Sequence, residues 1–130
     1  MQPKTVTYPI FLFIEVLRLL LIVSMAAVAE GNALLWYAAL PVLCVAPALW
    51  LMLSLDESKF DLWLPLLAFI KALSAVSFIA LSIRLLPDAL RFGTAGGNNP
   101  AAALPLAGLF VLVDGVMGIF AYGRYRVLCK

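Results

Sequence analysis

The sequence predicts an all-α polytopic membrane protein, built as an antiparallel bundle of four transmembrane helices. Hydrophobic residues make up 65% of the 130 residues, and the mean hydropathy is +1.09. Soluble domains are only about 45–50% apolar. Four apolar runs, approximately 8–29, 34–55, 61–85 and 103–123, are each long enough to cross a bilayer, which needs about 20 residues. We therefore expect a single four-helix transmembrane domain over residues 1–130.

The first helix is expected to begin near Tyr8 and Pro9, since proline is tolerated in the first turn of a helix. Gly31 and Asn32 are a stop signal after it. The connection to the next apolar run is so short that the first two helices must be antiparallel neighbours.

The same run has one feature of a secretory signal peptide. Residues 27–29 read Ala-Val-Ala, which has the small-x-small shape of a cleavage site. However, Glu15 and Arg18 interrupt what would be the uncharged core of a signal peptide. We therefore expect an uncleaved first helix that stays in the membrane.

The second helix contains Pro41 and Pro47, each of which removes a backbone donor and favours a kink. A hinge for a transport cycle is the alternative interpretation of these prolines. The polar residues 56–61 then form a turn before the third helix.

A long outer loop, residues 86–102, is expected between the third and fourth helices. Its first residues, 86–92, have the composition of one or two interfacial helical turns. The Gly- and Asn-rich stretch 93–100 favours a loop.

The distribution of lysine and arginine places both termini in the cytoplasm. Five basic residues fall on the side of the termini, namely Lys4, Lys59, Arg124, Arg126 and Lys130. Only Arg84 and Arg91 fall on the other side. Tyr8, Trp50, Trp63, Tyr122 and Tyr125 are interpreted as anchors near the inner interface. We expect a multi-pass protein of the plasma or inner membrane.

Four charged residues lie inside the apolar runs: Glu15, Arg18, Lys71 and Asp114. Three of them are about ten residues, or roughly 15 Å, from the inner ends of their helices, which is half the hydrocarbon thickness. Glu15 is one turn nearer the cytoplasm, on the same helix face as Arg18. A charge at this depth costs at least about 2.5–3.5 kcal/mol unless it is paired or hydrated.

The expected pairs are Glu15 with Arg18 and Lys71 with Asp114, although depth also permits the exchanged pairs. The four charges sum to zero, which is what a buried lock that fixes helix register requires. A polar cavity for a substrate or proton is the alternative, because ionisable residues within membranes mark functional sites.

The sequence contains no phosphate-binding glycine loop, catalytic triad, CxxC or metal-spaced cluster, and it has no histidine. We therefore expect no enzyme, no cofactor and no metal site. A net charge of +2 is too small to indicate nucleic-acid binding. Gly108, Gly115 and Gly118 in the fourth helix favour close helix packing.

Two functions are compatible with the sequence. The first is an accessory or scaffold subunit that packs against itself or a larger membrane complex, with the lipid bilayer as its surroundings. The alternative is a minimal oligomeric, proton-coupled transporter that uses Glu15, Lys71 and Asp114 in a polar intramembrane site.

Overall fold

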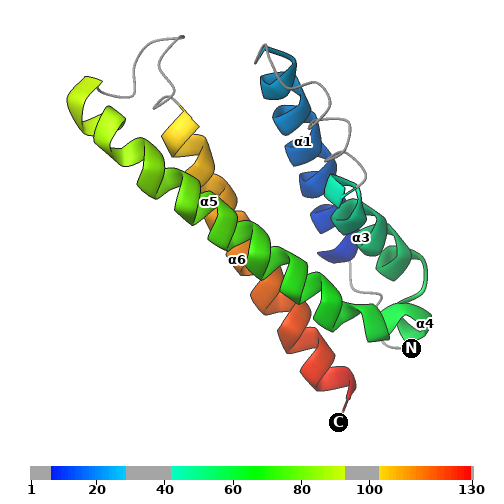
Figure 1. Ribbon diagram of the computed structural model, residues 1–130. Helices are drawn as coiled ribbons and strands as arrows, with labels where there is room; N and C mark the ends of the chain where they lie inside the picture. The colour runs from blue at the N-terminus through cyan, green and yellow to red at the C-terminus, as the bar shows by residue number, and fades with distance from the viewer. Residues whose placement is uncertain (1–6, 29–41, 93–102, 130) are drawn as a thin grey trace. The chain divides into compact units, whose positions relative to one another are not determined.

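The computed structural model describes residues 7–28, 42–92 and 103–129, and these residues are helical and free of β-strands (Figure 1). The elements in order are α1 (Thr7–Val28), α3 (Val45–Leu55), α4 (Glu57–Phe60), the 3₁₀ helix η1 (Asp61–Trp63), α5 (Leu64–Phe92) and α6 (Leu104–Leu128). Three segments are long and apolar enough to cross a membrane: α1, the stretch from α4 through α5, and α6. The chain divides into two compact units, residues 1–63 and 64–130.

In the first unit, α1 packs against α3. The Trp50 ring lies 5.0 Å from the Phe11 ring, edge to face, and 5.9 Å from the Tyr8 ring. Such aromatic contacts contribute about 0.5–1.5 kcal/mol beyond the apolar area they bury. Trp50 is 0% exposed and Tyr8 is 2% exposed. The interpretation of these two rings as lipid-interface anchors is therefore wrong, because they form the core of this unit.

The Tyr8 hydroxyl donates a hydrogen bond to the Glu57 carboxylate, which ties the start of α1 to α4. We expect Tyr8→Phe to lower the free energy of unfolding by about 1.5 kcal/mol, since hydrogen bonds to charged groups contribute about 1.5–3 kcal/mol. Thermal unfolding followed by circular dichroism would measure the change. Tyr122→Phe removes a hydroxyl from an exposed tyrosine and is the matched control. Equal stability of the two variants would contradict the role of this bond.

The predicted second helix is only partly within the described residues, because 34–41 lie outside them. Residues 42–43 are helical, a turn follows at Cys44, and α3 begins at Val45. Pro47 thus lies in the first turn of α3. Backbone N–H groups in a first turn have no acceptor within the helix, so the missing N–H of proline costs no helical hydrogen bond. The break in the helix explains how this proline is accommodated. The other kink position, Pro41, lies outside the described residues.

The polar turn is confirmed at Asp56, which caps α4 by accepting a hydrogen bond from the Lys59 backbone N–H. The Ser58 hydroxyl donates to the same carboxylate at 2.8 Å. This side-chain hydrogen bond is the main reason that the pKa of Asp56 lies below its usual value. The carboxylate therefore stays ionised at this exposed helix start.

In the second unit, α5 and α6 pack along each other in antiparallel directions (Figure 1). The Lys71 side chain contacts Asp114, and the Phe78 ring lies 5.1 Å from the Phe110 ring. Buried residues on α6 recur every three or four positions, at 107, 110, 114, 117 and 121. This is the spacing of a helix seam that packs knobs into holes.

Both helices of this unit are longer than the sequence predicted. α5 ends at Phe92, whereas we expected an end near residue 85 and an outer loop from residue 86. It continues through Pro87, which removes only one backbone hydrogen bond. α6 ends at Leu128 rather than residue 123. The remainder of the predicted outer loop, residues 93–102, lies outside the described residues.

Candidate functional site

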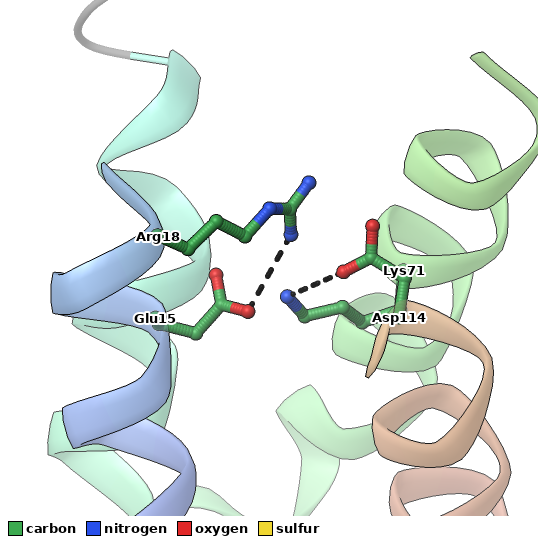
Figure 2. A network of polar contacts seen from close by, with 4 residues as sticks. All are labelled: Glu15, Arg18, Lys71 and Asp114. Atoms are coloured by element: carbon green, nitrogen blue, oxygen red, sulfur yellow. Dashed lines mark hydrogen bonds and ion pairs between the residues drawn. The ribbon is translucent and has the colours of Figure 1, made fainter. Parts of the chain in front are cut away.

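The four charged residues predicted within the apolar runs are all buried, and they form two ion pairs (Figure 2). One pair belongs to each unit of the chain. The pairs are Glu15–Arg18 and Lys71–Asp114, which are the partners that the sequence analysis expected first. The common membrane layer of Arg18, Lys71 and Asp114 stays a prediction, as does the exchanged pairing.

Glu15 and Arg18 both belong to α1. They are three residues apart, so the helix places both side chains on one face. The Arg18 Nη1 atom lies 3.5 Å from the Glu15 Oε1 atom. Charge-assisted hydrogen bonds are usually about 2.7–2.9 Å long, so this contact is a loose one. Glu15 is 4% exposed and Arg18 is 8% exposed.

Lys71 and Asp114 join two helices, α5 and α6. The Lys71 Nζ atom donates to the Asp114 Oδ1 atom at 3.1 Å, and both side chains are 0% exposed. Figure 2 shows this contact as a dashed line between the two helices. Because burial removes both charges from water, their mutual attraction is needed to offset the cost of desolvation.

Gly118 is the residue that lets the two helices approach at this point. A Cβ atom on Gly118 would lie 3.3 Å from the Lys71 Cβ atom and 3.7 Å from the Ala68 carbonyl oxygen. On the same helix, Gly115 has nothing within 4 Å of its Cβ position. The sequence predicts close helix packing at Gly108, Gly115 and Gly118 alike. The structure shows that, of these three, Gly118 is the one close to Lys71.

The Lys71 ammonium and the Asp114 carboxylate neutralise each other across α5 and α6. A structural ion pair requires this neutralisation. The described residues contain no group of three or more His, Cys, Asp or Glu side chains arranged to hold a metal ion.

Two further polar features of the first unit are not predictable from the sequence. One is the Tyr8–Glu57 hydrogen bond, which joins residues from opposite ends of this unit. The other is the Trp50 Nε1 atom, which is buried without a hydrogen-bond acceptor among the described residues. Neither belongs to a recognisable sequence motif, because each depends on how α1, α3 and α4 fold together.

Comparisons with protein-family models, with curated proteins and with solved structures gave no match to this chain.

Proposed function

We propose that this protein is an integral membrane accessory subunit, a four-helix antiparallel bundle that packs into a larger membrane assembly. The Lys71–Asp114 pair is the observation that supports this proposal best. It is fully buried, it joins neighbouring helices, and it lies beside the close approach at Gly118. These are the properties of a lock that fixes the register of a hairpin.

The apolar surface of the second unit suits such a role in a bilayer. Large hydrophobic side chains are exposed along the outer faces of both long helices, including Phe69, Val76, Leu112 and Ile119. In water such a surface would drive aggregation, whereas in a membrane it meets acyl chains or a partner helix.

The proposed topology places both termini in the cytoplasm and residues 93–102 outside. A single-cysteine series tests it, because the chain has only two cysteines, Cys44 and Cys129. With Cys44→Ser, Cys129 is expected to resist a membrane-impermeant maleimide until the cells are lysed. With both native cysteines replaced by serine, Asn98→Cys is expected to react in intact cells. Labelling of Cys129 in intact cells would contradict this orientation.

The accessory role itself is tested by purification and by transport. We expect the tagged chain, purified in mild detergent, to be recovered in complex with a second membrane protein. Light scattering and mass spectrometry would show a fixed stoichiometry. The transporter alternative instead predicts substrate-dependent proton uptake in vesicles that disappears in Glu15→Gln. Recovery of the chain alone together with such uptake would overturn the accessory role.

A further inference from the structure

From the part of α6 between Leu112 and Leu128, we infer a binding site for an anionic phospholipid, in which Arg126 takes the phosphate. The inference rests on the proposed placement in a membrane. It deepens that proposal by naming a ligand and the helix face that holds it.

One face of α6 carries a continuous exposed stripe. It consists of Leu112, Val116, Ile119, Tyr122 and Arg126. Successive members are three or four residues apart, so they lie on the same side of the helix. Leu112 is 69% exposed, Ile119 is 77% exposed and Tyr122 is 55% exposed. The seam that faces α5 lies on other positions, with Phe110 and Asp114 among them.

The chemistry of the stripe changes along the helix in the order of a phospholipid. Its first three side chains are branched and aliphatic, the fourth is a tyrosine, and the fifth is an arginine. Tyr122 is ten residues from Leu112, which is roughly 15 Å and equals about half the hydrocarbon thickness. Arg126 is one turn further, about 6 Å along the axis. The aliphatic side chains would therefore contact the acyl chains, Tyr122 the interfacial layer, and Arg126 the phosphate.

The positive charge at this end of α6 favours an anionic headgroup over a zwitterionic one. The sequence from Gly115 to Lys130 contains no Asp or Glu, while Arg124, Arg126 and Lys130 all fall within it. Arg124 and Arg126 are two residues apart on α6, so their positive potentials overlap within a Debye length of about 10 Å. The guanidinium group of Arg126 presents a planar fork that matches two phosphate oxygens, a group that every phospholipid headgroup carries.

The structure of α6 beyond residue 123 makes this site possible. A helix that ended there would leave Arg126 in an irregular tail, without a fixed relation to Tyr122. Because α6 continues to Leu128, Arg126 is held one turn beyond Tyr122 and on the same face.

Lipid titration of the purified full chain in detergent, followed by native mass spectrometry, tests the inference. The probes are phosphatidylglycerol and phosphatidylcholine with identical acyl chains. We expect tighter binding of phosphatidylglycerol, and we expect Arg126→Gln to weaken it about fivefold, since a basic residue near the surface contributes about 1 kcal/mol. Arg126→Lys is expected to retain most of the preference. Arg91→Gln, which removes the same charge from the end of α5, is expected to leave it unchanged.

Equal Kd values for the two lipids, or an undiminished preference in Arg126→Gln, would overturn the lipid site. Competition by free glycerol phosphate at micromolar concentration would also overturn it, because the apolar stripe would then contribute nothing. Alkaline extraction of cell membranes separates these failures from a failure of the proposed function. A chain released by alkali overturns both, whereas a chain that stays in the membrane with equal lipid affinities overturns only the lipid site.

Discussion

Asp114→Asn is expected to lower the free energy of unfolding by about 3 kcal/mol or more, the cost of leaving one charge of a buried pair without its counter-ion. The variant keeps the size of the side chain and removes only its charge, so the Lys71 ammonium remains buried without the Asp114 carboxylate charge. Unfolding of the detergent-solubilised protein by sodium dodecyl sulfate, followed by far-UV circular dichroism, measures this change.

Two further variants separate charge from packing. Lys71→Met combined with Asp114→Leu replaces the pair by apolar side chains, and stability near that of the original protein is expected because such replacements are often neutral. Asp56→Asn makes the same chemical change at an exposed helix cap, where asparagine caps as well as aspartate does. If Asp114→Asn and Asp56→Asn unfold at the same denaturant concentration, the Lys71–Asp114 pair is not a lock that fixes helix register.

Gly118→Leu is expected to lower stability by about 1–3 kcal/mol, the usual effect of forcing extra methylene groups into a packed core. Even the first atom of a side chain there would press on the Lys71 Cβ atom at 3.3 Å, and the Ala68 carbonyl oxygen is backbone that cannot rotate away. The two helices must separate to admit leucine, which also stretches the 3.1 Å contact between Lys71 and Asp114. The same detergent titration reports the loss.

Gly115→Leu is the control for this substitution. This substitution is on the same helix and also replaces a glycine by leucine. However, nothing lies within 4 Å of the Cβ position of Gly115. We expect a change of less than about 0.5 kcal/mol, as for other substitutions away from packed contacts. Equal damage at both positions would mean that helix propensity or lipid contact, rather than the α5–α6 approach, decides the outcome.

The helices themselves were predictable because long apolar runs leave few alternatives. The starts of α1 and α6 lie within a residue or two of the expected positions. The pairing of Glu15 with Arg18 was predictable as well, since helical spacing alone brings these residues together. Lys71 and Asp114 were paired from their similar distance to the helix ends, which is a weaker argument, and the structure confirms the pairing.

The ends of the long helices were not predictable from composition. Residues 86–92 were predicted as the start of an outer loop with one or two interfacial helical turns, yet Ala89, Leu90 and Arg91 have good helix propensity and continue α5 to Phe92. The burial of Trp50 was missed for a different reason. An aromatic residue near the end of an apolar run is typical of the membrane interface, and only the packing of α1 on α3 shows that this ring is internal.

The order of Lys71 and Asp114 along the chain has a consequence for biosynthesis. α5 leaves the ribosome before α6, so the ammonium of Lys71 exists for a time before the carboxylate of Asp114 has been made. Leaving that ammonium alone in lipid is unfavourable by several kcal/mol. For a chain that enters a bilayer, this favours release of α5 from the translocation machinery together with α6, as a preassembled neutral hairpin.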